Sequence, residues 1–281
     1  MYERLVLMKE LLANDGSIYV HLDYRMVHYV KLVMDEIFGR ENFRNEVVWC
    51  YTGSSSPKQR VYSRKHDVIL FYSKSNKWAW NPYSTMMQFA ESTKERAKRK
   101  DGSFGRVRDK PLPEFKYPED WWSDIQSLKA ESEKLPFPTQ KPEKLVERII
   151  LASSNEGDIV ADFFCGSGTL AAVAEKLGRR WVCCDMSKYA IHTTQKRLLD
   201  IANSKALGIR VEDESKRPKY EKPVRPFYLI TIANYMTDKI LAGKEAINLV
   251  LNLYGAAPFK QVSKHLHGIR EKEKEIVHVG Q

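Results

Sequence analysis

The stretch DFFCGSGTLAA, residues 162–172, decides the fold that we predict for this chain. It leaves an apolar run, Ile159–Phe164, that is typical of a buried strand, and it leads into a helix that ends near Gly178. Its glycines permit a tight turn and let a ligand approach the backbone, while N–H groups at the helix start offer hydrogen-bond donors. A second strand, Arg180–Cys184, and a second helix, 187–203, follow. This alternation predicts a parallel sheet.

Two acids flank the turn and indicate the kind of ligand. Asp185 stands at the end of the second strand, where a carboxylate can accept hydrogen bonds from both hydroxyls of a ribose. The letters GSGTLA also fit the G-x-G-x-x-G/A pattern, so a nicotinamide dinucleotide (NAD) site is the competing interpretation. Asp162 favours a different ligand, because a carboxylate beside the turn repels a pyrophosphate and attracts an ammonium group. S-adenosylmethionine carries a ribose and an ammonium group and lacks phosphate, so we predict a site for this cofactor.

Hydrophobic periodicity in the rest of the chain predicts further elements and a division into segments. Before residue 74 it predicts strands at Ile18–Asp23, Glu46–Tyr51 and Asp67–Ser73, and helices at 2–13 and 27–38. The periodicity fails after this region, which predicts an insertion, and it resumes in a helix with Pro142 near its first turn. A strand at Phe227–Ile232 and a helix at 244–254 are predicted near the end. The predicted segments are 1–74, 75–138, 139–207 and 208–281.

Composition limits the partners and the location of the protein. The 281 residues include 46 Lys plus Arg against 36 Asp plus Glu, and the net charge of +10 favours a polyanionic partner such as nucleic acid. Four cysteines without a C-x-x-C pair do not indicate disulfides or a metal site. No apolar stretch approaches the roughly 20 residues that cross a bilayer, and the N-terminus does not have the pattern of a signal peptide. We therefore expect a soluble, cytoplasmic protein.

Several stretches of the chain resemble the amino-methyltransferases of DNA, the adenine-N6 and cytosine-N4 enzymes of restriction-modification systems. These stretches are LLANDGSIYVHLD (11–23), FGRENFRNEVVW (38–49), KHDVILFYSKS (65–75), WWSDI (121–125), FPTQKPEKLVERII (137–150) and DFFCGSGT (162–169). Their order is most similar to that of Type III modification subunits, in which the catalytic motif precedes the cofactor motif. The resemblance implies an α/β fold: a Rossmann-like, S-adenosylmethionine-dependent methyltransferase sheet with helices on both faces and a target-recognition region inserted at 75–138.

The resemblance also implies roles for residues at matching positions. The residues expected to bind the cofactor are Asp162, Phe164, Gly166, Gly168 and Thr169 in the glycine turn, Asp185 as the ribose acceptor, Thr139, Gln140 and Lys141 over the methionine end, and Asp124 in the WWSDI stretch. Two alternatives stay open. Thr139 can act as the cap of the helix that follows it. Trp121 and Trp122 can be core residues.

A basic segment of the insertion is the expected contact with double-stranded DNA. Between Lys94 and Lys110, eight basic residues face three acidic ones, a net charge of +5. The residues expected to bind DNA are Lys94, Arg96, Lys98, Arg99, Lys100, Arg106 and Arg108. The nearby Phe104 and the position between motifs favour DNA over the alternative, a solvated surface.

The catalytic segment of the resembled enzymes is missing from the sequence. These enzymes act on a base that is flipped out of the duplex. Their D/N/S-P-P-Y/F/W segment holds the amine with a side-chain oxygen and a backbone carbonyl, and its aromatic residue stacks on the base. The nearest string here, Asn81-Pro82-Tyr83, lacks one proline and is expected to be a turn. Motif order places the segment before Met1, so we expect a chain that is truncated at its front, incomplete at its end and inactive alone.

The expected function is therefore that of a DNA amino-methyltransferase fragment, with a second chain that supplies the missing segment, or a restriction subunit, as a further partner. The strand that carries the segment belongs between Ile159–Phe164 and Ile18–Leu22. We expect a strand from another chain at this place, a gap, or direct closure of the two strands. The competing hypothesis is a non-catalytic DNA-binding or S-adenosylmethionine-binding remnant that acts with a partner. An RNA methyltransferase is a third.

Overall fold

The structure is a computed structural model that describes most of the chain. The described residues are 1–53, 60–89, 91–98, 113–128, 133–209, 211, 216–231, 257–258, 268–270 and 275–277. The chain divides into two units, 1–225 and 226–281. The predicted helix at 244–254 and the basic residues Arg99, Lys100, Arg106 and Arg108 lie outside the described residues.

A mostly antiparallel sheet forms the N-terminal half of the first unit. Its strands, in spatial order, are β1 (Ser17–Leu22), β3 (His66–Ser73), β2 (Phe43–Cys50) and β6 (Trp121–Trp122). The first three pair antiparallel, whereas β6 runs parallel to β2. The three strands predicted before residue 74 are therefore confirmed.

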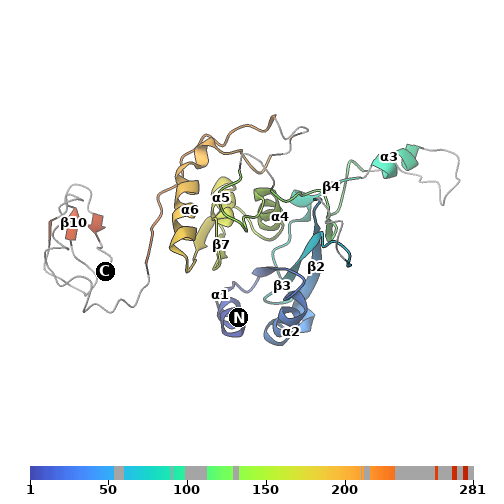
Figure 1. Cartoon of the computed structure of the whole chain (residues 1–281), viewed down its shortest axis with the longest axis horizontal. Helices are drawn as coiled ribbons and strands as arrows, with labels where there is room; N and C mark the ends of the chain where they lie inside the picture. The colour runs from blue at the N-terminus through green and yellow to red at the C-terminus, as the bar shows by residue number, and fades with distance from the viewer. Residues whose placement is uncertain are drawn as a thin grey trace. The chain divides into compact units, whose positions relative to one another are not determined.

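Two helices, α1 (Tyr2–Leu11) and α2 (Val27–Phe38), pack against this sheet (Figure 1). The cluster between them and β3 contains Leu5, Val27, Val30, Met34, Ile37, Phe38, Val68, Leu70 and Tyr72. Ile18, Val20 and Leu22 pack against the same cluster. Because alternate residues of a strand point to one face, this packing confirms the alternation predicted for the first strand.

A second cluster joins the sheet to helix α4 (Glu143–Ser153). Its buried residues are Val47, Trp49, Ile69, Trp122, Ile125 and Leu145. The Trp49 indole N–H donates a hydrogen bond to the Ile125 carbonyl at 2.7 Å. Trp122 is 6% exposed and is a core residue, as the packing alternative predicted, whereas Trp121 is 54% exposed.

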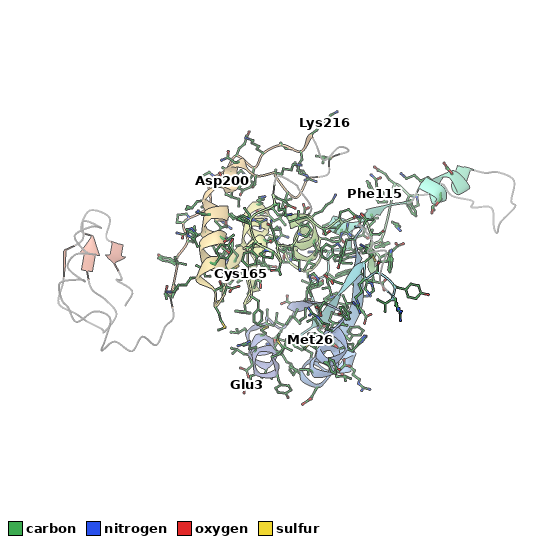
Figure 2. All side chains as sticks on the ribbon, viewed as in Figure 1. Glu3, Met26, Phe115, Cys165, Asp200 and Lys216 are labelled. Carbon is green, nitrogen blue, oxygen red and sulfur yellow. The ribbon has the colours of Figure 1, made fainter. Side chains whose placement is uncertain are left out.

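The C-terminal half of the first unit is built around the glycine turn. Strands β7 (Ile159–Asp162) and β8 (Arg180–Cys183) pair in parallel. Helix α5 (Thr169–Lys176) connects them, and α6 (Lys188–Leu199) follows. Figure 1 shows α4 between the N-terminal sheet and α5, and Figure 2 marks the glycine turn by Cys165. The predicted parallel strand pair is confirmed.

The two sheets do not join within the described residues. There β1 pairs only with β3 and β7 pairs only with β8, so each has one unpaired edge. Direct closure of these two strands, one of the expected arrangements, is therefore wrong. The β7–β8 pair also exposes apolar side chains, since Ile159 is 60% and Val182 is 48% exposed. Unpaired edges of this kind are suited to accept a further strand.

The predicted insertion contains short elements, and its last part packs on the main sheet through β6. The others are η2 (Pro82–Thr85), β4 (Met87–Gln88), α3 (Glu91–Lys98) and β5 (Phe115–Lys116), and β4 pairs antiparallel with β5. The Asn81 amide donates hydrogen bonds to the Ser154 carbonyl and to Asn155 Oδ1, both at 3.1 Å. Asn81-Pro82-Tyr83 therefore begins a turn that is fixed to the end of α4, as predicted.

Residues that follow α6 return to the outside of α5. A short helix, η3 (Ile201–Asn203), leads into a segment whose Arg225 binds Glu175 through both guanidinium and backbone N–H groups. The Glu175 side chain is 2% exposed, so this ion pair is shielded from water on the side of the acid. Arg225 is the last residue of the first unit.

The prediction of a strand at Phe227–Ile232 is wrong for its described part. Residues 227–231 form no strand, and Tyr228 and Ile230 are 94% and 77% exposed. An apolar run that pairs with no strand gains no ladder of hydrogen bonds, so periodicity alone gave a wrong prediction here.

The second unit contains β9 (Ala257–Pro258), β10 (Gly268–Arg270) and β11 (Glu275–Val277) in one antiparallel sheet. None of the helices in the described ranges is long and apolar enough to span a bilayer.

Candidate functional site

The glycine turn between β7 and α5 is tightly packed. Gly166 and Gly168 have φ values of 51° and 70°, in the left-handed region where other residues are strained. A Cβ atom on Gly168 would lie 2.5 Å from Thr194 Cγ2, and one on Gly166 would lie 3.1 Å from Phe137 Cε1. The turn therefore requires glycine at both positions, because each glycine packs closely against a neighbouring side chain.

Two carboxylates stand at the ends of the parallel strands beside this turn. Asp185 accepts hydrogen bonds from the Gly166 and Ser187 N–H groups, each at 2.9 Å. Asp162 accepts one from the Phe164 N–H at 3.0 Å. A carboxylate has about four acceptor sites, so both groups retain capacity for further donors. The backbone bonds fix the two carboxylates in place and leave them available to a ligand.

The electrostatics of the two acids favour a cationic ligand. Burial raises the pKa of Asp162 above its ordinary value, and the negative charge of Asp185 raises it further. Neither acid forms an ion pair with a basic side chain in the described part of the chain. A positive group between them would remove this repulsion. The donors and acceptors therefore fit a ligand with a ribose and an ammonium group, and they disfavour a pyrophosphate.

The segment before α4 lies against the glycine turn. The Thr169 hydroxyl donates a hydrogen bond to the Lys141 carbonyl at 3.2 Å. Gln140 accepts from the Leu135 N–H at 2.7 Å and donates to the Glu133 carbonyl at 2.6 Å, so its side chain orders this segment.

An open pocket of about 350 Å³ adjoins this segment. Its lining residues are Leu128, Lys134, Leu135, Pro136, Phe137, Pro138 and Gln140. The Phe137 ring, which covers Gly166, stacks on Tyr189 at a centroid distance of 5.7 Å. Phe137 therefore lines this pocket and also contacts the glycine turn.

The capping alternative for Thr139 is wrong. Helix α4 begins at Glu143 with Pro142 as its N-cap, and no side chain caps it. Proline has a fixed φ near −65° and no N–H, so it begins a helix without a side-chain acceptor. Thr139 lies three residues earlier and is exposed. Its binding role stays a prediction.

The side chain of Lys141 belongs to a polar cluster that sequence reasoning missed. His21 Nε2 and Asp67 Oδ2 are 3.0 Å apart, and the Tyr51 hydroxyl donates to Asp67 Oδ1 at 3.4 Å. Burial lowers the pKa of Lys141, and the negative charge of Asp67 opposes this shift. The polar letters of the first strand, YVHLD, were the only indication of this cluster in the sequence.

Asp124 pairs with Arg148 of α4 and not with the residues of the glycine turn in the described part of the chain. Its two carboxylate oxygens accept hydrogen bonds from Arg148 at 3.0 and 2.5 Å. Partial burial opposes ionisation, but Arg148 outweighs it and lowers the pKa of Asp124. No hydrogen bond between Asp124 and the glycine turn occurs in the described residues, and its expected role in the cofactor pocket stays a prediction.

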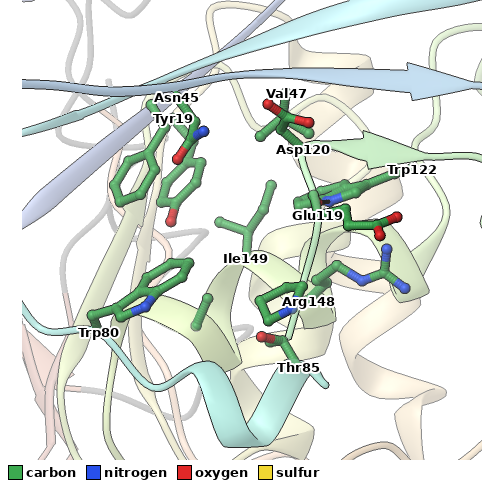
Figure 3. Close-up of a pocket in the computed structure, with 13 residues that line it drawn as sticks. Tyr19, Asn45, Val47, Trp80, Thr85, Glu119, Asp120, Trp122, Arg148 and Ile149 are labelled. Atoms are coloured by element: carbon green, nitrogen blue, oxygen red, sulfur yellow. Dashed lines mark hydrogen bonds between the residues drawn. The ribbon is translucent and has the colours of Figure 1, made fainter. Parts of the chain in front are cut away.

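A second, aromatic pocket of about 80 Å³ lies between the sheet and α4 (Figure 3). Tyr19 stacks on Phe71 at 4.4 Å, and Trp80 continues the stack at 5.9 Å. The acids Glu119 and Asp120 also line the pocket. It does not include the glycine turn.

Of the basic residues expected to bind DNA, Lys94, Arg96 and Lys98 lie in α3, and the other four lie outside the described residues. Lys94 is partly buried and engaged in interactions within the chain. The role of these residues stays a prediction.

Comparison with known proteins gives a consistent set of relatives. Residues 1–196 match the family N6_N4_Mtase, which is described as DNA methylase. The chain is 28% identical over 253 residues to the Type II methyltransferase M.EcaI of Enterobacter cloacae. The matched region covers 70% of this chain and 56% of that protein. The chain is 28% identical over 282 residues to M.HpaI of Haemophilus parainfluenzae, covering 95% of this chain and 79% of the relative.

A further relative and a solved structure complete the comparison. The DNA adenine methyltransferase YhdJ of Escherichia coli K12 is 30% identical over 206 residues, covering 72% of this chain and 67% of that protein. The structure of PvuII DNA methyltransferase (cytosine-N4-specific) superimposes with a TM-score of 0.53 at 18% identity, over 70% of this chain and 68% of that one. This likeness confirms the predicted fold class. The chain spans little more than half the length of M.EcaI.

Proposed function

Because the chain belongs to the N6_N4_Mtase family of DNA methylases, we propose that it is a DNA methyltransferase that acts on the exocyclic amine of adenine (N6) or cytosine (N4). The observation that carries this proposal is the pair of carboxylates, Asp162 and Asp185, beside a turn that requires glycine. S-adenosylmethionine supplies the methyl group on a sulfonium sulfur. Asp185 would accept hydrogen bonds from the ribose hydroxyls, and Asp162 would pair with the ammonium group. Thr139, Gln140 and Lys141 would close over the methionine end.

Calorimetry tests the proposed cofactor. S-adenosylhomocysteine has the same ribose and ammonium groups and transfers nothing, so it is the suitable probe. We expect it to bind more tightly than NAD, because the acids repel the pyrophosphate of NAD. Tighter binding of NAD would overturn the assignment.

The affinity for S-adenosylhomocysteine is expected to fall on acidification. Asp162 has a raised pKa in the free protein, and an ammonium group beside it lowers that pKa in the complex. Binding therefore releases a proton, and the affinity rises with pH through the interval between the two pKa values. Titration calorimetry from neutral pH down to about pH 4, near the ordinary pKa of an aspartate, measures the dependence. Asp162→Asn should weaken binding and flatten the profile, whereas an unchanged profile would show that Asp162 does not contact the cation.

Methyl transfer needs a group that holds the flipped base, and the arrangement of the strands supports a place for it. The 281 residues contain no D/N/S-P-P-Y/F/W segment. The unpaired edges of β1 and β7 offer main-chain groups to one further strand. We propose that a strand outside these residues, from the same or a second polypeptide, carries the catalytic segment between them.

We further propose that residues 75–138 form the target-recognition region and contact double-stranded DNA through the basic segment 94–110. Neutralising Arg99, Lys100 and Arg106 should make the negative slope of log K against log salt concentration less steep. The expected change is up to about 0.9 for each DNA phosphate that the variant no longer neutralises. Fluorescence anisotropy with a labelled duplex measures the slope. Neutralising Lys216, Lys219 and Lys222, which are exposed elsewhere on the chain, is the charge-matched control. Equal slopes in the wild type and both variants would leave the basic segment as plain surface.

A non-catalytic protein that binds S-adenosylmethionine or DNA with a partner is the second candidate, and the missing catalytic segment favours it. A methyl-transfer assay on duplex DNA, with a chain extended by the missing segment as control, separates the two functions.

A further inference from the structure

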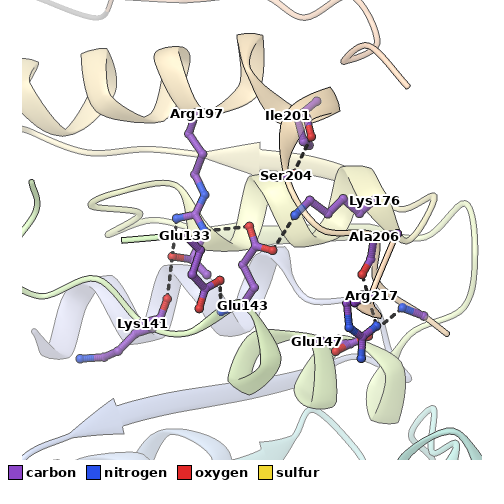
Figure 4. A network of polar contacts seen from close by, with 12 residues as sticks. Glu133, Lys141, Glu143, Glu147, Lys176, Arg197, Ile201, Ser204, Ala206 and Arg217 are labelled. Carbon is purple, nitrogen blue, oxygen red and sulfur yellow. Dashed lines mark hydrogen bonds and ion pairs between the residues drawn. The ribbon is translucent and has the colours of Figure 1, made fainter. Parts of the chain in front are cut away.

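A buried group of three charges connects the segments that surround the glycine turn (Figure 4). Glu143, the first residue of α4, accepts a hydrogen bond from Lys176 Nζ at 2.5 Å and one from Arg197 Nη2 at 2.8 Å. The side chains of Glu143, Lys176 and Arg197 are 7%, 0% and 8% exposed. Burial opposes ionisation of Glu143, but Arg197 and Lys176 lower its pKa below its ordinary value. Glu143 is therefore an anion held between two cations.

Arg197 contacts the glycine turn as well as Glu143. Its Nη1 donates to Thr169 Oγ1 at 3.0 Å and to the Ser167 carbonyl at 3.4 Å. The Thr169 hydroxyl in turn donates to the Lys141 carbonyl. One guanidinium thus connects α6, the glycine turn and the start of α4.

The contacts of Lys176 differ from those of Arg197. Lys176 belongs to α5, behind the turn, and its ammonium group donates to Glu143. Lys176 offsets the charge of the buried acid, which would otherwise be an uncompensated buried charge. Arg197 does this too, and it also holds two groups of the turn through the planar fork of its guanidinium.

We propose that Arg197, oriented by Glu143, is a positioning residue that holds the glycine turn in the conformation that receives S-adenosylmethionine. This inference rests on the proposed function. Arg197 acts through Ser167 and Thr169, so its substitution changes the affinity of the turn for a ligand and the protection of its amides. The pair of Glu143 and Arg197 was not predicted from the sequence, because the two residues are 54 positions apart.

The test compares Arg197→Lys with a matched substitution, Arg225→Lys. Both arginines pair with a buried glutamate and both substitutions keep the charge, but Arg225 binds Glu175 on the outside of α5 and does not touch the turn. A lysine at 197 can still neutralise Glu143, but its ammonium group cannot hold Glu143 and both turn groups at once. Glu143→Asp, which shortens the arm that orients Arg197, is the second variant.

Two measurements decide the outcome. We expect Arg197→Lys to weaken S-adenosylhomocysteine binding by on the order of tenfold and to speed hydrogen exchange at residues 163–170, with Glu143→Asp between it and the wild type. Arg225→Lys should change the affinity by less than about twofold, whatever its melting temperature. Wild-type affinity in Arg197→Lys, or equal losses in both lysine variants, would overturn the proposal. If the wild type binds no S-adenosylhomocysteine, the proposed function fails, and the hydrogen exchange of the turn still decides the role of Arg197.

Discussion

The 281-residue chain alone is expected to bind S-adenosylhomocysteine but to transfer no methyl group to DNA. Transfer to an exocyclic amine needs two hydrogen-bond acceptors on the amine and an aromatic ring on the flipped base, held in line with the methyl donor. The sequence has no segment with that combination. Loss of such positioning lowers the rate by on the order of 10⁵-fold.

A tritiated-methyl transfer assay on duplex DNA measures this directly. The control is the same chain extended by a strand that carries D-P-P-Y, which should restore turnover if the strand fits between β1 and β7. Robust turnover by the 281-residue chain would contradict the prediction. Asn81-Pro82-Tyr83 would then be the first segment to substitute, although the Asn81 amide is engaged by Ser154 and Asn155.

Replacing Asp185 with alanine is expected to remove most of the affinity for S-adenosylhomocysteine. The substitution would delete the two charge-assisted hydrogen bonds that we propose to the ribose, each worth about 1.5 to 3 kcal/mol. It also leaves the Gly166 and Ser187 N–H groups without their acceptor, so the turn itself loses support. A loss of about 3 kcal/mol or more corresponds to at least about a hundredfold weaker binding.

Titration calorimetry measures the affinity, and Asp158→Ala is the matched control. Asp158 is an exposed acid just before β7 that also accepts a backbone N–H, from Asn155 at 2.7 Å, but it is not at the glycine turn. Its replacement should leave the affinity unchanged. Unchanged binding in Asp185→Ala would mean that the ribose lies elsewhere and that the assignment of the turn is wrong.

Local patterns in the sequence determined the elements and the glycine turn between β7 and α5. The alternation of strand and helix around residues 162–172 predicted the parallel β7–β8 pair, and Asp162 and Asp185 stand beside the turn as expected from their places at strand ends. These features depend on neighbours within a few residues or on the register of one strand pair. Periodicity and turn chemistry report such short-range relations directly.

Only the tertiary structure decided which distant side chains meet. It placed Asp124 on Arg148, brought Lys141 to Asp67, and joined Glu143 to Lys176 and Arg197. It also showed that the apolar run 227–231 forms no strand and that β1 and β7 each have an unpaired edge in the described chain. Ion pairs and strand pairing join residues that are tens of positions apart. Their formation depends on burial and on which partner lies nearby in the fold. The residue pattern of a single segment specifies neither of these.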